Sequence, residues 1–371
     1  MGLPIWEDGR WEGFPSLVED VDADVCVIGL GGSGLAAVGE ALRLGRSVVG
    51  VDSGLVGGAA AGRNAGFLLA GMAPFHHDLA ATIGAERATA LYRLTQAEVA
   101  RMSEETPDLI QITGSLRIAA SDEELADCVR QLETMRTHRL DAEPYEGPEG
   151  AGLLFPDDGT LDPLARCRFL ARAASSNGAA LYESTTATEI AEGRVATLRG
   201  SVQCSSVVVA VDGNLDVVLP ELAGQVRTAR AQVLATEPLA SVRFPRPVYT
   251  RWGYDYYQQL PDRRLLLGGF RDRAPETEWT REPVPSDAVQ DLLESFLRDE
   301  LRVEAAITHR WAGLIAFTDD KLPVLKEVRP GVWACGAYSG TGNVVGAICG
   351  RLAMRLALGE PAPGSELLAT A

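Results

Sequence analysis

The stretch from residue 24 to residue 52 constrains the fold more than any other part of the chain. It begins with an uncharged apolar run at 25–28, typical of a strand buried on both faces of a parallel sheet. Three glycines follow at G-x-G-x-x-G spacing, Gly29, Gly31 and Gly34. A second apolar run, 48–51, ends at Asp52, where a carboxylate accepts hydrogen bonds from a ribose. The sequence therefore predicts a strand–helix–strand unit that binds a dinucleotide.

Each glycine of this unit has a physical reason. The first permits the tight turn, the second lets a pyrophosphate approach the backbone, and the third lets the helix lie close to the strand. The N-terminus of the expected helix offers unpaired N–H groups and the positive end of a dipole to the phosphates. Both NAD and FAD suit such a unit, so the spacing alone does not choose between them.

A second cluster of small residues, 54–67, favours a flavin. A plain NAD unit has no need of two glycine-rich loops so close together, whereas a bulky isoalloxazine must approach the backbone and accept hydrogen bonds from it. Arg63 suits the pyrophosphate as a cation. Asn64 is placed to reach flavin edge atoms or to cap the next turn. We interpret Arg63 as functional rather than as a solvated surface arginine because it lies inside this glycine-rich loop.

The whole-chain composition excludes several classes of protein. The 371 residues predict two or three domain-sized units, and the net charge of −17 argues against nucleic acid or an anionic membrane as the main partner. No apolar run approaches the ~20 residues of a membrane span, and the N-terminus lacks the apolar core of a signal peptide. The six cysteines show no C-x-x-C pair or zinc spacing, so we expect buried thiols. These features predict a soluble cytoplasmic protein.

The glycine fingerprint, Asp52 and the segment 58–67 (GAAAGRNAGF) resemble the FAD-dependent D-amino-acid oxidase (DAO) superfamily. They are most similar to its γ-glutamylputrescine oxidase-like amine oxidase branch, whose corresponding loop reads G-A-S-G-R-N-G-G; Ala61 stands where that loop carries serine. The resemblance implies an α/β fold of the glutathione-reductase type. It comprises a doubly wound, Rossmann-like FAD/NAD(P)-binding domain and a mixed-sheet α+β substrate domain. Two later segments, 309–324 and 332–343, resemble the superfamily's final flavin-binding strand and loop.

The expected FAD-binding domain is discontinuous, and the substrate domain is inserted into it twice. We expect the FAD-binding domain at 21–85, 146–225 and 305–371, the substrate domain at 86–145 and 226–304, and an N-terminal arm at 1–20. Apolar periodicity predicts helices at 78–105, 286–301 and 344–358, and the turn-rich stretch 144–163 is interpreted as a crossover. Alternation predicts a strand at 249–259 with Trp252, Tyr254 and Tyr256 on one face, forming a hairpin with 264–270.

Spacing and resemblance together give a set of expected FAD contacts. Sarcosine-oxidase-like relatives attach their flavin to a cysteine near the last segment, but no cysteine lies between Cys204 and Cys335, so non-covalent FAD is expected. The expected cofactor-binding residues are Gly29, Gly31, Ser33, Gly34, Asp52, Ser53, Arg63, Asn64, Ala65, Gly66, Ala187, Ala210, Gly213, Gly336, Ser339, Gly340, Thr341, Gly342 and Asn343.

The chemistry implied by the resemblance is oxidation of a primary or secondary amine, or of an amino-acid derivative. A hydride passes from the α-carbon to flavin N5, the imine hydrolyses, and dioxygen reoxidises the flavin to give hydrogen peroxide. The pattern assigns no general base, and the expected pocket residues are Tyr256, Arg251 and Trp311, because aromatic rings attract cations and exclude water. Ile315 and Ala316 replace the Arg-Pro with which amino-acid-oxidising relatives hold a substrate carboxylate.

Three other functions stay open. Leu266 stands where relatives present a lysine for oxygen activation, which favours a dehydrogenase that passes electrons to a quinone or a partner protein. A flavin-binding accessory protein without turnover and, more weakly, an NAD-dependent dehydrogenase are the other two. The pair His76-His77 is interpreted as part of a loop near a helix N-terminus rather than as a metal site, since no third ligand is evident.

Overall fold

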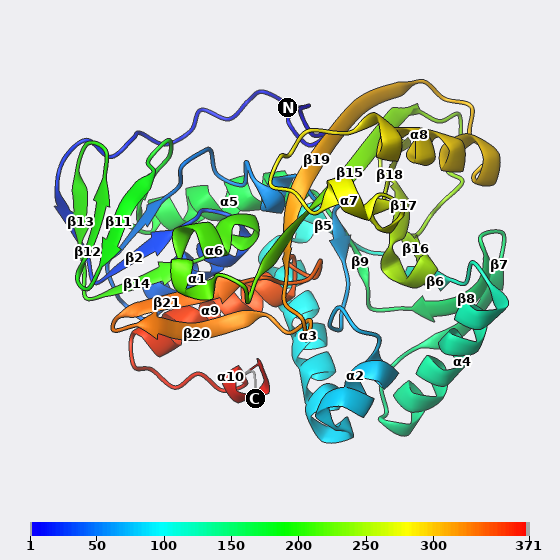
Figure 1. Cartoon of the computed structure of the whole chain (residues 1–371), viewed down its shortest axis with the longest axis horizontal. Helices are drawn as coiled ribbons and strands as arrows, with labels where there is room; N and C mark the ends of the chain where they lie inside the picture. The colour runs from blue at the N-terminus through cyan, green and yellow to red at the C-terminus, as the bar shows by residue number, and fades with distance from the viewer. Residues whose placement is uncertain (1, 369–371) are drawn as a thin grey trace. The chain divides into compact units, whose positions relative to one another are not determined.

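The computed structural model describes residues 2–368, which divide between two compact units (Figure 1). Unit 1 consists of Met1–Glu7, Asn64–Asp162 and Ala229–Leu314, and unit 2 of Asp8–Arg63, Pro163–Thr228 and Ile315–Ala371. Within the described part of the chain, no helix is both long and apolar enough to cross a membrane.

Unit 2 is built on a six-stranded sheet in the order β10-β3-β2-β14-β21-β20. Adjacent strands of this sheet pair in parallel, except β20 and β21, which pair antiparallel. The central strands are buried along their whole length, as their uncharged valine-rich sequences require. The strands are β2 (Val25–Ile28), β3 (Val48–Val51), β10 (Ala180–Tyr182), β14 (Ser206–Val209), β20 (Val324–Arg329) and β21 (Val332–Gly336).

The remaining elements of unit 2 are a small sheet and the helices. The small sheet has the order β1-β13-β12-β11, formed by β1 (Val21–Asp22), β11 (Ala187–Ala191), β12 (Arg194–Thr197) and β13 (Ser201–Gln203). The helices are α1 (Gly32–Arg43), α5 (Pro163–Ser176), α6 (Leu215–Val218), α9 (Val345–Ala357) and α10 (Ser365–Leu368).

Unit 1 contains most of a mixed eight-stranded sheet, in the order β19-β15-β18-β17-β16-β6-β8-β7, and a three-stranded sheet in the order β4-β9-β5. Its helices are α2 (His76–Ile83), α3 (Ala85–Glu105), α4 (Asp122–Thr137), α7 (Pro275–Glu278) and α8 (Asp287–Ser295). Its strands are β4 (Phe67–Leu68), β5 (Ile110–Ile112), β6 (Ser115–Ile118), β7 (Glu143–Gly147), β8 (Gly150–Phe155), β9 (Gly159–Leu161), β15 (Arg227–Pro238), β16 (Val248–Thr250), β17 (Asp255–Gln259), β18 (Arg264–Gly268) and β19 (Ile307–Phe317).

Three expectations about local structure were wrong. The helix expected at 78–105 is two helices separated at Gly84, whose φ of 88° no regular helix accepts. The expected crossover at 144–163 contains β8, β9 and most of β7: β7 and β8 form a hairpin, β8 also pairs with β6, and β9 pairs with β4 and β5. The expected strand at 249–259 is broken at Arg251 and Trp252, where φ is positive, so only β16 and β17 remain.

The bounds of the two units differ from the expected domain bounds. The first expected FAD-binding segment extends to residue 85, whereas unit 2 gives way to unit 1 after Arg63; the last begins at 305, whereas unit 2 resumes at Ile315. The division into an FAD-binding and a substrate domain therefore stays a proposal, in which unit 2 corresponds to the first and unit 1 to the second.

Candidate functional site

The turn between β2 and α1 is packed so closely that side chains are excluded. A Cβ added to Gly34 would overlap the carbonyl oxygen of Gly29, and one added to Gly29 would lie 2.6 Å from the carbonyl oxygen of Ala210. Gly29 also has a φ of 100°, which favours glycine. The N-cap of α1 is Gly31, and its first turn carries no acidic side chain. The turn thus presents backbone N–H groups where an anionic phosphate is favoured.

Asp52 is oriented by this same turn. Its Oδ2 accepts a hydrogen bond from the N–H of Leu30 at 2.7 Å, and its Oδ1 accepts one from the N–H of Gly54 at 2.8 Å. Burial raises the pKa of Asp52, the two backbone N–H groups oppose that rise, and the neighbouring Glu183 adds to it. A carboxylate has about four acceptor positions, so two remain for ribose hydroxyl groups.

Glu183, which the sequence analysis did not single out, holds the second glycine-rich loop. It directly follows β10, and its carboxylate accepts the N–H of Val56 at 2.5 Å and the indole N–H of Trp11 at 2.8 Å. Its side chain is buried. An acid directly after a strand of the parallel sheet, as at Asp52, is the signal that would have identified it.

Asp212 plays the corresponding part for the last loop. It follows β14, and its two carboxylate oxygens accept the N–H groups of Ala316 and Tyr338, each at 3.1 Å. Burial raises the pKa of Asp212 to about 6, opposed by backbone N–H donors that include Ala337. One carboxylate thus ties the end of β19 to the loop after β21.

The loop that follows β21 forms a polar cradle. Ala337, Ser339 and Gly340 all have positive φ values, 55°, 52° and 97°. Such conformations turn successive N–H groups to one side and form a concave site for an anionic or polar group. The Ser339 hydroxyl is buried with no partner among residues 2–368, and a Cβ at Gly340 would meet no described atom within 4 Å. An orphaned buried hydroxyl beside open space fits a polar ligand.

Within unit 2 the first turn and this last loop meet. Helix α9, which follows the loop, packs so closely on α1 that a Cβ at Gly350 would overlap the carbonyl oxygen of Ser33. The Tyr338 ring lies against Gly342 and Gly346, where an added Cβ would be 3.3 and 3.2 Å from it. Unit 2 therefore brings together the two glycine-rich segments expected to bind a dinucleotide.

The other expected cofactor contacts in unit 2 have varied surroundings. Arg63 is buried, which lowers its pKa, and Ser53 follows Asp52 after β3. Ala187 begins β11, and the carbonyl of Gly213 accepts the Thr228 hydroxyl at 2.8 Å. The remaining expected residues of unit 2 lie at the end of β21 or in the loop up to α9: Gly336, Thr341, Gly342 and Asn343.

Asn64, Ala65 and Gly66 belong to unit 1. The Asn64 side chain accepts the N–H of Gly66 at 2.8 Å, so the amide caps its own turn, one of the two roles considered for it. Trp6 donates its indole N–H to the Asn64 carbonyl at 2.9 Å, and Gln258 donates to the Ala65 carbonyl. The sequence analysis missed these two anchors, because each acts from a distant segment.

The three expected pocket residues lie in different environments in unit 1. Tyr256 is half-buried, its ring centroid is 5.7 Å from that of Phe67, and burial raises its pKa to about 12. Trp311 is fully buried in an apolar cluster that includes Ala65 and Leu266. Tyr256 packs against this cluster. Arg251 instead forms ion pairs with Asp255, at 2.7 Å, and with Asp272.

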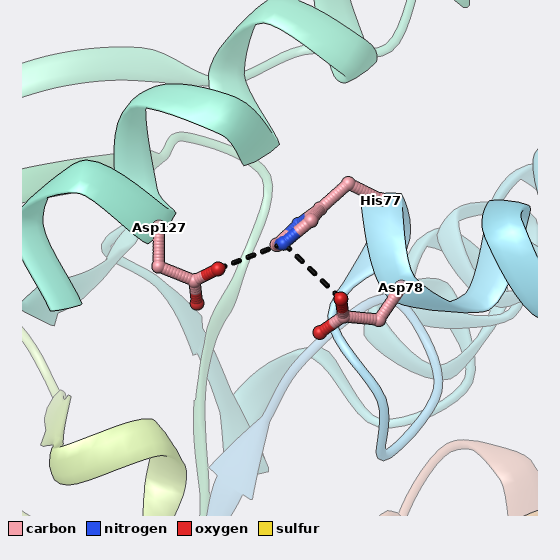
Figure 2. A group of neighbouring side chains, drawn as sticks. All are labelled: His77, Asp78 and Asp127. Atoms are coloured by element: carbon pink, nitrogen blue, oxygen red, sulfur yellow. Dashed lines mark hydrogen bonds and ion pairs between the residues drawn. The ribbon is translucent and has the colours of Figure 1, made fainter. Parts of the chain in front are cut away.

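A group of histidine and aspartate side chains joins α2 to α4 (Figure 2). His76 and His77 lie in the first turn of α2 rather than in a loop beside a helix N-terminus, so that part of the interpretation was wrong. The Nε2 of His77 is 2.8 Å from Asp127 and 3.4 Å from Asp78, neighbours that the sequence analysis did not identify. Asp127 also pairs with Arg117 at 2.5 Å and Arg130 at 2.9 Å. Since two guanidinium groups already neutralise this carboxylate, we assign the group to structure rather than to a cation.

Comparisons with known proteins agree with this geometry. Residues 24–356 match a family described as FAD dependent oxidoreductase (DAO). The chain is 28% identical to a probable oxidoreductase OrdL of Rhizobium meliloti, covering 94% of this chain and 86% of that protein. It is 27% identical to the gamma-glutamylputrescine oxidoreductase of Escherichia coli, covering 95% and 87%. The fold is similar to that of the glycine oxidase of Geobacillus kaustophilus, with a TM-score of 0.77 and 21% identity over 95% of this chain and 99% of that one.

Proposed function

This chain belongs to the DAO family of FAD-dependent oxidoreductases, and from that premise we propose that it oxidises a primary or secondary amine, or an amino-acid derivative. When bound, FAD supplies the acceptor for the hydride that leaves the α-carbon. The amine N–H proton passes to solvent, and the imine hydrolyses to a carbonyl compound and an amine or ammonia. Dioxygen is the proposed final electron acceptor, with hydrogen peroxide as its product.

The observation that carries this proposal is that, within unit 2, the turn between β2 and α1 meets the loop that follows β21. Backbone N–H groups at the start of α1, the oriented carboxylate of Asp52 and the buried Ser339 hydroxyl are donors and acceptors of the kinds that FAD requires. Arg63 supplies a buried cation for the pyrophosphate. These residues bind and orient; none of them needs to act as an acid or a base.

In unit 1, the proposed substrate wall is apolar and aromatic. Tyr256 and Phe67 pack edge to face beside a cluster that contains Ala65, Leu266 and Trp311. Such a wall excludes water and attracts the cationic form of an amine before reaction. The Tyr256 hydroxyl, whose pKa burial raises to about 12, is protonated near neutral pH and can donate a hydrogen bond to a substrate. We therefore propose Tyr256 as a contact residue and Trp311 as packing behind Ala65.

An anaerobic screen tests the proposal. Amines and amino acids, gamma-glutamylputrescine among them, are mixed with the FAD-loaded protein without oxygen, and loss of the oxidised-flavin absorbance is followed. We expect bleaching by at least one amine, and rapid recovery with formation of peroxide when air is admitted. If no amine bleaches the flavin, amine oxidation is excluded and an accessory flavoprotein is the better description.

A second candidate, a dehydrogenase, is favoured by one observation. Leu266 is fully buried in the same apolar cluster as Ala65, so this position offers no cation to assist oxygen. A dehydrogenase would be bleached by its amine, recover slowly in air, and recover quickly with a quinone or a redox dye.

The cytoplasm is the proposed compartment, because the buried thiols of all six cysteines suit a reducing environment.

A further inference from the structure

The part of the N-terminal arm that belongs to unit 2, residues 8–20, contains no helix or strand but is fixed by specific contacts. Leu17 is buried, and its N–H donates to the Thr185 hydroxyl at 3.0 Å. The carbonyl of Pro15 accepts the N–H of Glu183 at 3.1 Å. The arm therefore lies along the segment that directly follows β10.

The side chain of Glu183 joins this arm to the second glycine-rich loop. It is 1% exposed, and its carboxylate accepts three hydrogen bonds: from the Trp11 indole N–H at 2.8 Å, the Phe14 N–H at 2.6 Å and the Val56 N–H at 2.5 Å. Two of these donors belong to the arm. Gly13 lets the arm approach this closely, because its φ is 77° and an added Cβ would lie 2.6 Å from the Glu183 Oε2. The arm is thus part of the environment that satisfies a buried carboxylate.

The same loop is bonded to the turn between β2 and α1. Gly57, directly after Val56, donates its N–H to the Leu30 carbonyl in that turn at 3.0 Å, and the Leu30 N–H donates to the Asp52 Oδ2 at 2.7 Å. Thr185, which binds the arm, also donates its N–H to the Asp52 carbonyl at 2.7 Å. Hydrogen bonds therefore connect the arm to the turn proposed to hold the pyrophosphate and to the carboxylate proposed to bind the ribose.

We propose that Trp11 is a positioning residue for FAD: acting through Glu183, it holds the second glycine-rich loop in the conformation that binds the cofactor. Without the indole N–H, the Glu183 carboxylate has one donor fewer and fixes the Val56 N–H less firmly. The loop then spends more time in conformations that do not bind FAD, and the apparent dissociation constant rises as the binding-competent fraction falls. This inference rests on the proposed FAD site and not on the identity of the substrate.

The test is a titration of the apoprotein with FAD, without any amine, followed by the quenching of flavin fluorescence. Trp11→Phe removes the indole N–H but keeps a ring beside Arg168 and Arg172, whose guanidinium carbons lie 5.4 and 4.9 Å from the centroid of the Trp11 ring. We expect this variant to raise the dissociation constant of FAD at least about fivefold, as the loss of a hydrogen bond to a buried charge predicts.

A double-mutant cycle separates this role from general support of the fold. Glu183→Met keeps the length of the side chain but leaves only a weak acceptor, so it should weaken FAD binding at least as much as Trp11→Phe. Adding Trp11→Phe to Glu183→Met should then change the dissociation constant no further, because the carboxylate through which Trp11 acts is gone. An arm that supports only the fold would instead weaken binding equally in both backgrounds.

The same arm supplies a matched control. The Oδ1 of Asp20 accepts both the N–H and the hydroxyl of Ser201, each at 2.8 Å, so Asp20→Ala removes two hydrogen bonds of the arm that do not involve Glu183. This variant should keep the dissociation constant of FAD within about twofold of the wild-type value, because the competent fraction of the loop is unchanged.

Two results would overturn the inference: wild-type affinity for FAD in Trp11→Phe, or an equal effect of this substitution with and without Glu183. Titration of Gly34→Ala shows which proposal has failed. If Gly34→Ala weakens FAD binding and Trp11→Phe does not, only the role of the arm is wrong. If both variants bind FAD like the wild type, the proposed FAD site is wrong as well.

Discussion

At Gly34 a single methyl group decides whether the first turn can form. A Cβ there would overlap the carbonyl oxygen of Gly29, which is backbone and cannot swing away. We therefore expect Gly34→Ala to cost more than about 2 kcal/mol of stability and to lower the FAD bound per chain. Thermal unfolding and the ratio of flavin to protein absorbance measure both effects.

The same helix supplies the control for Gly34. Gly39 is exposed, and an added Cβ meets nothing within 4 Å. Gly39→Ala should raise stability by roughly 0.5–1 kcal/mol, because alanine has the higher helix propensity, and should leave FAD content unchanged. A Gly34→Ala protein with wild-type FAD content and unfolding temperature would contradict the close-packing argument.

Local geometry was predictable where the partners lie close in sequence. The close packing of Gly34 on Gly29 and the position of Asp52 beside the same turn follow from the spacing within one strand–helix–strand unit. Glu183 and Gln258 hold loops 127 and 193 residues away, at Val56 and Ala65, and no local pattern records such pairs. Arg251, which was expected in the substrate pocket, pairs with Asp255 four residues away and with Asp272 in the next loop, and the sequence analysis identified neither ion pair.

At the scale of elements, helix α2 begins with a buried histidine that makes stability depend on pH. His76 is buried, its Nε2 is 2.8 Å from the Nδ1 of His138, and its ring lies against Tyr92. Burial, and then the neighbouring His138 and His77, lower the pKa of His76 from 6.5 to about 4. Between pH 4 and pH 6.5 the unfolded chain binds more protons at this position than the folded chain. The contribution of His76 to the free energy of unfolding is therefore fully present above pH 6.5 and decreases as the pH falls towards 4.

The free energy of unfolding is expected to fall by on the order of 3 kcal/mol when His76 becomes protonated in the folded chain. Urea unfolding of the wild type and His76→Gln at pH 7.5 and pH 5 measures it, because glutamine keeps a polar side chain but does not titrate. The variant should lose about 1–2 kcal/mol less than the wild type between these two pH values. Equal losses would show that His76 does not titrate in this window.

Elements with local signals were predicted well, and those that depend on distant pairing were not. Ser121 accepts the N–H of Glu124 at 3.2 Å at the start of α4, a bond between residues only three apart that a local S-x-x-E pattern indicates. The break after β16 had no local signal, because Glu124 causes it from α4 by accepting the N–H groups of Arg251 and Trp252 at 3.1 and 2.7 Å. Short strands such as β9 likewise depend on partners far along the chain.

At the scale of the whole molecule, the central sheet of unit 2 requires three separate chain segments. Strands β2 and β3 come from the first, β10 and β14 from the second, and β20 and β21 from the third. The first glycine-rich turn and the last loop flank this assembly, so neither segment alone forms the proposed FAD site. Binding of FAD should therefore be coupled to the folding of all three segments and stabilise unit 2 as a whole.

That coupling and the burial of the thiols lead to a prediction about how FAD is held. All six cysteines are buried, and burial raises the pKa of Cys335, the one directly before the last loop, to about 12, so its reactive thiolate is suppressed at neutral pH. We expect acid precipitation to release all the flavin into the supernatant. FAD at 100 times its dissociation constant should stabilise the protein by about 2.7 kcal/mol, seen as a rise of a few degrees in unfolding temperature. The Cys335→Ala variant should also release all its flavin. If flavin instead stays with the precipitated wild type and is released only from this variant, the flavin is bound covalently to Cys335.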